Sequence, residues 1–342
     1  MFEKVSVVNS LINMYGKCGN LTMAQSLFHQ TTQDIATWNS LISCYADSGH
    51  PFKALTLFDE LISTGLKPNT ATLVTLLSAC AQIASVEKGR KIHDYIREQG
   101  FEYEVSLATG LVDMYAKCGQ IDLAKEIFDS MDEKDVVSWN VMISSYGMHG
   151  HGKSAINVFQ QMEENGARPN DLTFLAVLSA CAHAGLVDEA KSLFDKMKEF
   201  SIIPTLKHYA CMVDLYGRSA CKMHNNAEMG IKIAKHAIET DPENDGYYIL
   251  ISDFYSSVEM WKEVEQVRRT MKDRGLMSIG RRDVLVPNDA ADESCEQVYE
   301  KSNKRFCYKL QTLWEWQWVR FRSEVGPSDV AFEAIIGSRG GL

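Results

Sequence analysis

The sequence repeats itself at a spacing of about one hundred residues, and the repeated segment has an internal period of about 34 residues. Three pairs of segments carry the repeat: MYGKCGN at 14–20 and MYAKCGQ at 114–120, TWNSLISCYADSGH at 37–50 and SWNVMISSYGMHGH at 138–151, and LLSACAQ at 76–82 and VLSACAH at 177–183. Periods of this length are typical of solenoids of helical pairs, in which each unit buries its apolar face against its neighbours. Because a solenoid acts through a long surface, the repeat favours a binding scaffold over an enzyme.

Each unit is predicted to form two helices. Over residues 38–45 the apolar side chains recur at i, i+3, i+4 and i+7, which places them on one helical face. Gly49 interrupts this spacing, which resumes over residues 54–61. Pro68 disfavours helical backbone at the residue before it, so the pair ends there. No segment before residue 280 alternates at period two over any length, and we therefore predict an all-α fold.

The repeated segments resemble those of plant pentatricopeptide repeat proteins, in the subclass whose long, short and standard-length motifs alternate. The resemblance rests on the WN-x-x-I-S-x-Y core and on the MYxKCG and LSACA signatures, whereas the aromatic and Leu-Gly spacing of tetratricopeptide repeats is absent. It implies a right-handed superhelical solenoid of helix-turn-helix repeats. Six motifs are assigned over residues 1–205: short at 5–34, standard at 35–69, long at 70–104, short at 105–135, standard at 136–170 and long at 171–205.

The resemblance continues after residue 205 with a break in it. HYACMVDLYGRS resembles the first half of a final short motif, assigned to 206–219, and residues 221–276 resemble the E region that follows the last repeats in this subclass. E-region helices are therefore expected over 220–280. About one repeat of sequence is missing near Ser219, through a true deletion or a gene-model splice error.

The tail, residues 281–342, differs in character from the rest of the chain. Trp314, Trp316 and Trp318 lie within a few residues of one another, and the end is rich in glycine. Two interpretations stay open: a segment without a stable fold, from translated intron or frame-shifted sequence, and an appendix that binds a partner through its tryptophans. The tail has no apolar run of about 18 residues, so we expect no membrane span in it.

The sequence shows no sign of catalytic or metal chemistry. Nine cysteines occur singly, and those at helical positions are interpreted as small buried core residues rather than disulfides: Cys18, Cys44, Cys80, Cys118 and Cys181. No CxxC pair with an upstream HxE is present, so the zinc-deaminase signature is missing. The histidines lack the spacing of metal ligands. We expect no catalytic residue, no metal site, no cofactor and no enzymatic activity, so that any deaminase would act in trans.

The resemblance assigns base-reading residues, because in this family the fifth and the last residue of each motif face the RNA base. The four pairs are Asn9 and Asp34, Asn39 and Asn69, Thr109 and Asp135, and Asn140 and Asn170. In the family, Asn at the fifth position goes with pyrimidines and Thr with purines. A carboxylate accepts the ring N–H of uracil or guanine, whereas an amide NH₂ donates to the ring acceptor of cytosine. The predicted RNA word is U, C/U, any, G, C/U, any, from 5′ to 3′.

Two other sets of positions depart from this rule. The long motifs carry Val74 with Glu104 and Leu175 with Thr205, which match no base and are expected to set the spacing. At the second position, where the family holds the base between branched apolar side chains, Val137 is the candidate. Most other second positions are small, which lowers a stacking contribution of about 1–3 kcal/mol per base. For any single Asn at a helix start, a helix cap is the competing explanation.

The resemblance implies sequence-specific binding of single-stranded RNA in organellar RNA processing, foremost site recognition for C-to-U editing, with the E region recruiting a deaminase or other editing proteins. One alternative is a protein–protein scaffold, which the net charge of −10 favours because phosphate binding ordinarily needs a basic field. Another is a non-functional fragment of an editing factor. We expect a mitochondrial location, with the chloroplast as the alternative. Residues 1–11 do not resemble an organellar transit peptide, which we expect this chain to lack.

Overall fold

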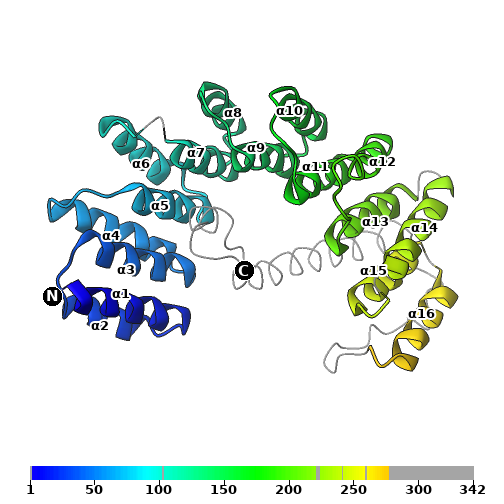
Figure 1. Ribbon diagram of the computed structural model, residues 1–342, viewed down its shortest axis with the longest axis horizontal. Coiled ribbons are helices and arrows are strands. Elements are labelled where there is room, and N and C mark those ends of the chain that lie inside the picture. Colours follow the sequence, from blue (N-terminus) through cyan, green and yellow to red (C-terminus); the bar gives the residue numbers. More distant parts are fainter. Residues whose placement is uncertain (1, 102–103, 221–223, 241, 259, 277–342) are drawn as a thin grey trace, which may run out of the picture. The chain divides into compact units, whose positions relative to one another are not determined.

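The structure is a computed structural model that describes residues 2–276 except 102–103, 221–223, 241 and 259. This part of the chain contains sixteen helices and no strand (Figure 1), which confirms the all-α prediction. The two interpretations of the tail over 281–342 lie outside the described residues. The chain divides into two compact units, whose described parts are residues 2–145 and 146–276.

The first unit is built from helical pairs joined by short turns. Its helices are α1 (Phe2–Lys17), α2 (Leu21–His29), α3 (Ile35–Asp47), α4 (Pro51–Ser63), α5 (Thr70–Gln82), α6 (Val86–Glu98), α7 (Val105–Lys117), α8 (Ile121–Ser130) and α9 (Val136–Met148), whose last turn belongs to the second unit. We call the odd-numbered helices first helices and the even-numbered ones second helices. The first helices stack in a row, α1 on α3, α3 on α5 and α5 on α7, and the second helices pack on the first helices.

The turns follow from local sequence. Asp34 caps α3, because its Oδ1 accepts the backbone N–H of Thr37 at 2.8 Å. Gly49 ends the helix region after α3 with φ of 76°, a left-handed conformation that glycine adopts without strain. Pro51 then occupies the first turn of α4, where its missing N–H costs nothing. The chain thus reverses between α3 and α4 as the residue spacing predicts.

The two copies of the repeat build the same core contact. Trp38 of α3 is 3% exposed and meets the ring of Phe28 edge-on, with ring centroids 4.7 Å apart. Trp139 of α9 meets Phe128 in the same way, with centroids 5.0 Å apart. Such edge-to-face pairs contribute about 0.5–1.5 kcal/mol beyond the area that they bury. The WN core of the sequence therefore anchors each first helix to the preceding second helix.

The second unit continues the pattern in its own part of the chain. Its helices are α10 (Gly152–Glu164), α11 (Asp171–Ala184), α12 (Val187–Lys196), α13 (Leu206–Ala220), α14 (His224–Thr240), α15 (Asp245–Ser257) and α16 (Trp261–Asp273). Within it α11 stacks on α13 and α13 on α15. The helices α3, α5, α7, α9, α11 and α13 begin at the residues where the predicted motifs begin.

The helices on the two sides of the predicted break near Ser219 pack against each other. A Cβ at Gly230 of α14 would lie 3.1 Å from the Cβ of Tyr216 in α13 and 2.3 Å from the ring of Phe254 in α15. The glycine therefore permits α14 to lie close to both neighbours. As a result, α14 takes the place of a second helix for α13, although its sequence resembles the E region.

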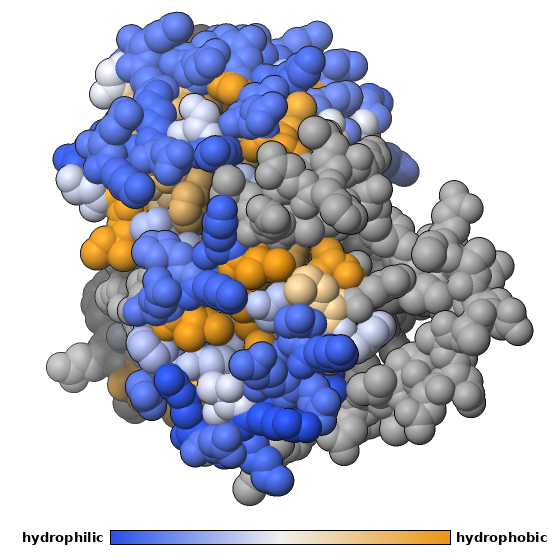
Figure 2. Space-filling view, turned by 90° about the vertical axis from the view of Figure 1, so that its right-hand side faces the viewer, coloured by the Kyte–Doolittle hydropathy of each residue, from blue (hydrophilic) through white to orange (hydrophobic). Residues whose placement is uncertain are grey.

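The surface of the described residues is mainly polar. On the face drawn in Figure 2, hydrophilic residues make up most of the coloured surface, and hydrophobic residues reach it in patches between them. The exposed large hydrophobic side chains of the second unit include those of Met148, Ile203 and Trp261. Among the described helices, none combines the length and the apolar character that crossing a bilayer requires.

Candidate nucleic-acid interface

The predicted base-reading residues fall on two kinds of position. The fifth residues lie within first helices: Asn9 in α1, Asn39 in α3, Thr109 in α7 and Asn140 in α9. The last residues stand directly before the next first helix: Asp34, Asn69, Asp135 and Asn170. Because α5 stacks on α3, the start of α5 lies beside the interior of α3.

The second pair, Asn39 and Asn69, is in direct contact. The Nδ2 of Asn39 donates a hydrogen bond of 3.0 Å to the Oδ1 of Asn69. The hydroxyl of Thr72 lies within hydrogen-bond distance of the Oδ1 atoms of both residues. Two side chains that are far apart in sequence therefore form one polar cluster at the junction of α3 and α5. Asn140 and Asn170 lie in different units.

All four last residues cap a helix. Their side-chain Oδ1 atoms accept the backbone N–H three residues further on, in the pairs Asp34 with Thr37 at 2.8 Å, Asn69 with Thr72 at 3.1 Å, Asp135 with Ser138 at 2.8 Å and Asn170 with Thr173 at 2.9 Å. The capping explanation that the sequence left open therefore holds at every last residue. It does not extend to the fifth residues, which lie inside their helices.

Capping leaves a second polar atom of the side chain for a ligand. An aspartate cap uses one oxygen, so in Asp34 and Asp135 the other oxygen remains as an acceptor. An asparagine cap also uses its oxygen, so in Asn69 the Nδ2 donor remains. Asp34, Asn69 and Asp135 are all exposed. The cap therefore fixes which group each side chain turns outward: an acceptor for aspartate and a donor for asparagine.

The fifth residues lie at different depths. Asn9 and Asn39 are half-buried, whereas Thr109 is 2% exposed and Asn140 is 6% exposed. The Oδ1 of Asn9 and the Oγ1 of Thr109 are buried and have no hydrogen-bond partner among the described residues. An unsatisfied buried polar atom costs about 1–3 kcal/mol. Val137, the predicted base-sandwiching residue, is half-buried in the first turn of α9.

Sequence reasoning missed the residues that hold the last residues in place. Thr72 and Thr173 complete capping boxes, since each hydroxyl also accepts the backbone N–H of the asparagine it serves, at 3.2 and 3.0 Å. The signal was present, because a threonine three residues after an asparagine is the spacing of such a box. These threonines orient the asparagine side chains.

The first helices carry little net charge. Over the seven first helices from α1 to α13, acidic and basic residues are equally frequent, whereas acids outnumber bases on the second helices α2 to α12. Lys17 and Lys117 lie two turns beyond Asn9 and Thr109, on the same helical face. The Nζ of Lys117 forms an ion pair of 2.8 Å with Asp113, and burial raises the pKa of that carboxyl against the opposing effect of the lysine.

The cysteines follow the predicted core role in part. Cys44, Cys80 and Cys181 are buried, and burial raises the pKa of their thiols to about 11, 12 and 12 respectively. Their sulfur atoms are therefore protonated and unreactive at neutral pH. Cys18 is exposed, so the prediction of a buried core residue is wrong there, because it stands directly after the end of α1. Cys118, directly after the end of α7, is only half-buried. Within the described residues no cluster of His, Cys, Asp or Glu could hold a metal ion.

Models of known families match most of the described chain. The model described as the PPR repeat family matches residues 33–82 and 134–183, and the model described as the PPR repeat matches 6–32, 108–136 and 172–202. The model described as the E motif matches residues 224–279.

Curated relatives agree with these matches. The pentatricopeptide repeat-containing protein CRR2, chloroplastic, of Arabidopsis thaliana is 37% identical over 306 residues, which are 80% of this chain and 47% of that protein. The pentatricopeptide repeat-containing protein At5g27110 of the same plant is 39% identical over 297 residues, which are 78% of this chain and 43% of that protein. The chain therefore spans less than half the length of these relatives.

A solved structure shares the fold. The crystal structure of the pentatricopeptide repeat protein PPR10 in complex with an 18-nt psaJ RNA element aligns with a TM-score of 0.62 and 22% sequence identity, over 80% of this chain and 41% of that chain. The alignment confirms that the stacked helical pairs form a helical-repeat solenoid.

Proposed function

This chain belongs to the pentatricopeptide repeat proteins and carries an E motif, and from this premise we propose that it binds single-stranded RNA in a sequence-specific manner. The observation that carries the proposal is the cluster of Asn39 and Asn69 at the junction of α3 and α5. A fifth and a last residue meet there, and the cap turns the free donor of Asn69 outward. The crystal structure of PPR10 in complex with an 18-nt psaJ RNA element supports the same ligand class.

Base discrimination follows from the atom that capping leaves free. The remaining oxygen of Asp34 accepts the ring N–H of uracil, and that of Asp135, which is paired with Thr109 in the reading rule, accepts the ring N–H of guanine. The Nδ2 of Asn69 donates to the ring nitrogen of cytosine or to a carbonyl oxygen of uracil. The chain then binds the word U, C/U, any, G, C/U, any from 5′ to 3′, with Asn140 and Asn170 specifying the fifth base and Val137 packing against a base.

The biological role that we propose is recognition of C-to-U editing sites in an organelle. The match to the E motif over residues 224–279 supports the recruitment of a deaminase or other editing proteins by α14 to α16. The names of several relatives place those proteins in the chloroplast, which supports an organellar location for this chain. Either organelle, mitochondrion or chloroplast, is consistent with this role. We also propose that the motifs alternate in the order short, standard-length and long.

A protein–protein scaffold is the second candidate function. The observation that favours it is the lack of net positive charge on the first helices. Without a basic field, phosphate contacts contribute little and binding depends on the base contacts. RNA binding by this chain should therefore be selective for sequence, whereas a scaffold would bind every RNA equally weakly.

The substitution Asn69→Asp tests the proposal. It exchanges the outward donor for an acceptor while an aspartate oxygen still caps α5, so the second base should change from C/U to U alone. Gel shifts with the full chain and RNAs that differ only in C or U at the second position measure this, and we expect C-containing RNA to lose about tenfold in affinity.

Asn20→Asp is the matched control. Asn20 caps α2 by accepting the N–H of Met23 at 3.2 Å, and no base-reading role is assigned to it. The control adds the same charge at another asparagine cap and should leave the preference between C and U unchanged. If Asn69→Asp binds both RNAs as the unmodified chain does, the proposed reading is wrong, and equal weak binding to unrelated RNAs would leave the scaffold function.

A further inference from the structure

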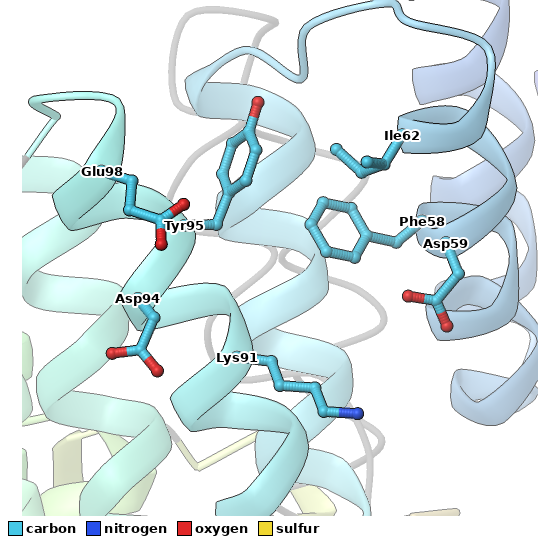
Figure 3. Close-up of a pocket in the computed structure, with 7 residues that line it drawn as sticks. All are labelled: Phe58, Asp59, Ile62, Lys91, Asp94, Tyr95 and Glu98. Carbon is cyan, nitrogen blue, oxygen red and sulfur yellow. The ribbon is translucent and has the colours of Figure 1, made fainter.

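A groove lies between the second helices α4 and α6 of the first unit. It has a volume of about 350 Å³, and its lining residues are Phe58, Asp59, Ile62, Lys91, Asp94, Tyr95 and Glu98. Figure 3 shows Phe58 and Ile62 of α4 and Tyr95 of α6 pointing toward one another across it. All seven residues belong to second helices, so the groove is separate from the predicted base-reading residues.

The floor of the groove is aromatic and its rim is acidic. The rings of Phe58 and Tyr95 meet edge-on with centroids 5.8 Å apart. Asp59 on α4 and Asp94 and Glu98 on α6 supply three carboxylates around these rings. An aromatic face attracts a cation through its quadrupole, and nearby carboxylates add to that attraction. The groove therefore has the chemical character of a site for a positively charged side chain.

The second copy of the repeat shows such a cation in place. There α10 and α12 occupy the positions of α4 and α6, and the Nζ of Lys196 lies 5.5 Å from the centroid of the Phe159 ring. The same Nζ contacts the two carboxylate oxygens of Glu163 at 2.6 and 2.7 Å. Phe159 is the counterpart of Phe58, so the second copy covers its ring with a lysine of its own chain.

The first copy lacks that lysine and its partner. Tyr95 stands where the second copy has Lys196, and Ile62, which is 39% exposed, stands where the second copy has Glu163. Two of the three rim carboxylates have acidic counterparts in the second copy, since Asp94 corresponds to Asp195 of α12 and Glu98 to Glu199, which follows α12. Asp59 corresponds to Gln160. Among the described residues, the first copy therefore keeps the phenylalanine ring and carboxylates beside it, but the ring of Tyr95, rather than a cation, lies against Phe58, which is 8% exposed.

We propose that this groove binds an arginine or lysine side chain presented by a basic segment of a partner protein. The cation lies over the ring of Phe58, with the stem of the side chain against Ile62 and Tyr95, and the carboxylates of the rim accept its N–H groups. RNA does not fit this site, because its phosphates would face three carboxylates. A protein partner bound here leaves the first helices free for RNA.

Lys91 limits the affinity of the groove. It extends from α6 toward α4 in Figure 3, and the second copy has a serine at its position. Its positive charge repels an incoming cation, and removing that charge should strengthen binding. A substitution that removes this charge should therefore increase binding, whereas a substitution that only disrupts the fold would decrease it.

The test uses the full chain and a fluorescein-labelled peptide of alternating arginine and alanine, with a second peptide that has glutamine at each arginine. Fluorescence anisotropy measures both. The double substitution Ile62→Glu with Tyr95→Lys copies the internal ion pair of the second copy into the first, and it leaves the net charge unchanged. We expect this double variant to bind the arginine peptide with about tenfold lower affinity. The glutamine peptide should bind neither the unmodified chain nor any variant.

Lys91→Ser should raise the affinity for the arginine peptide several-fold. The matched control Lys153→Ser, at an exposed position of α10, should leave this affinity unchanged.

If the double variant has a lower melting temperature, Asp94→Asn with Glu98→Gln tests the same site without altering the rings. Unchanged peptide affinity in both double variants would overturn the proposal. Self-association of the chain that the double variant abolishes would also overturn it, by identifying a second copy as the occupant. RNA gel shifts should be the same for all these variants.

Discussion

The two copies of the short motif, in α1 and in α7, share the MYxKCG signature but have very different surroundings. Val7 is 59% exposed and its counterpart Leu107 is completely buried, while Met14 is 44% exposed and Met114 is completely buried. The difference arises because α7 packs on α5, whereas no helix precedes α1 among the described residues. A repeat in a solenoid therefore takes much of its stability from its neighbours rather than from its own sequence.

The largest expected effect of this difference is at the paired tyrosines. Tyr115 is 2% exposed and its hydroxyl lies 2.9 Å from the Nδ1 of His93, whereas Tyr15 is only half-buried. Tyr115→Ala should lower the free energy of unfolding by about 3–5 kcal/mol, the range for buried aromatic residues. Tyr15→Ala should lower the free energy of unfolding by clearly less. Urea unfolding of both variants measures this, and equal losses would show that the preceding repeat does not determine the burial energy.

An intermediate effect is expected at the fifth residues of the same two motifs. Thr109→Asn makes the second short motif carry the combination of the first, an asparagine with an aspartate, and should change the preferred fourth base from G to U. Asn140 is 6% exposed within α9, so an asparagine is tolerated at a buried fifth position. Gel shifts with G or U at that position should show a reversal of about tenfold. Retention of the preference for G would contradict the assignment of Thr109.

The smallest expected effect comes from a different pair of helix starts. Asn170 and Thr173 cap α11, whereas at α13 the Nδ1 of His208 accepts the backbone N–H of Thr205 at 3.0 Å, and its Nε2 donates to the carbonyl oxygen of Asp171 at 2.9 Å. This arrangement requires a neutral imidazole. Burial lowers the pKa of His208 below 6.5, with Lys207 adding to the shift and Asp171 opposing it.

Because the unfolded chain binds a proton near pH 6.5 and the folded chain only at lower pH, the contribution of His208 is present above pH 6.5 and is lost as the pH falls below it. His208→Thr, which copies Thr173, should remove this dependence. Thermal unfolding should show a loss of stability between pH 7.5 and pH 5.5 that the variant lacks. An identical pH dependence in the variant would assign the loss to other groups.

The groove between α4 and α6 extends the comparison to the outer surface. The two copies differ there at Ile62 and Tyr95 against Glu163 and Lys196, so the phenylalanine ring meets a tyrosine ring in the first copy and a lysine cation in the second. Neither the period nor the signatures of the repeat include these positions. Copies that share a core can therefore differ in what their surfaces bind.

Local sequence was enough to predict the helices. The spacing of apolar residues, the glycines with positive φ after the helices and the capping residues act within one or two turns, so they can be read from neighbouring letters. For the same reason the last residues Asp34, Asn69 and Asp135 could be placed at helix starts. The match of the helix starts to the repeat reflects this local control.

Only the tertiary structure decided which residues that are distant in sequence lie next to one another. The bond between Asn39 and Asn69, the depth of Thr109 and the packing of α14 against α13 all join residues that are distant in sequence. These contacts depend on how a first helix stacks on the next, which the residues of one motif do not specify. The repeat determined the type of fold, and the stacking of neighbouring repeats determined which polar atoms are left for a ligand.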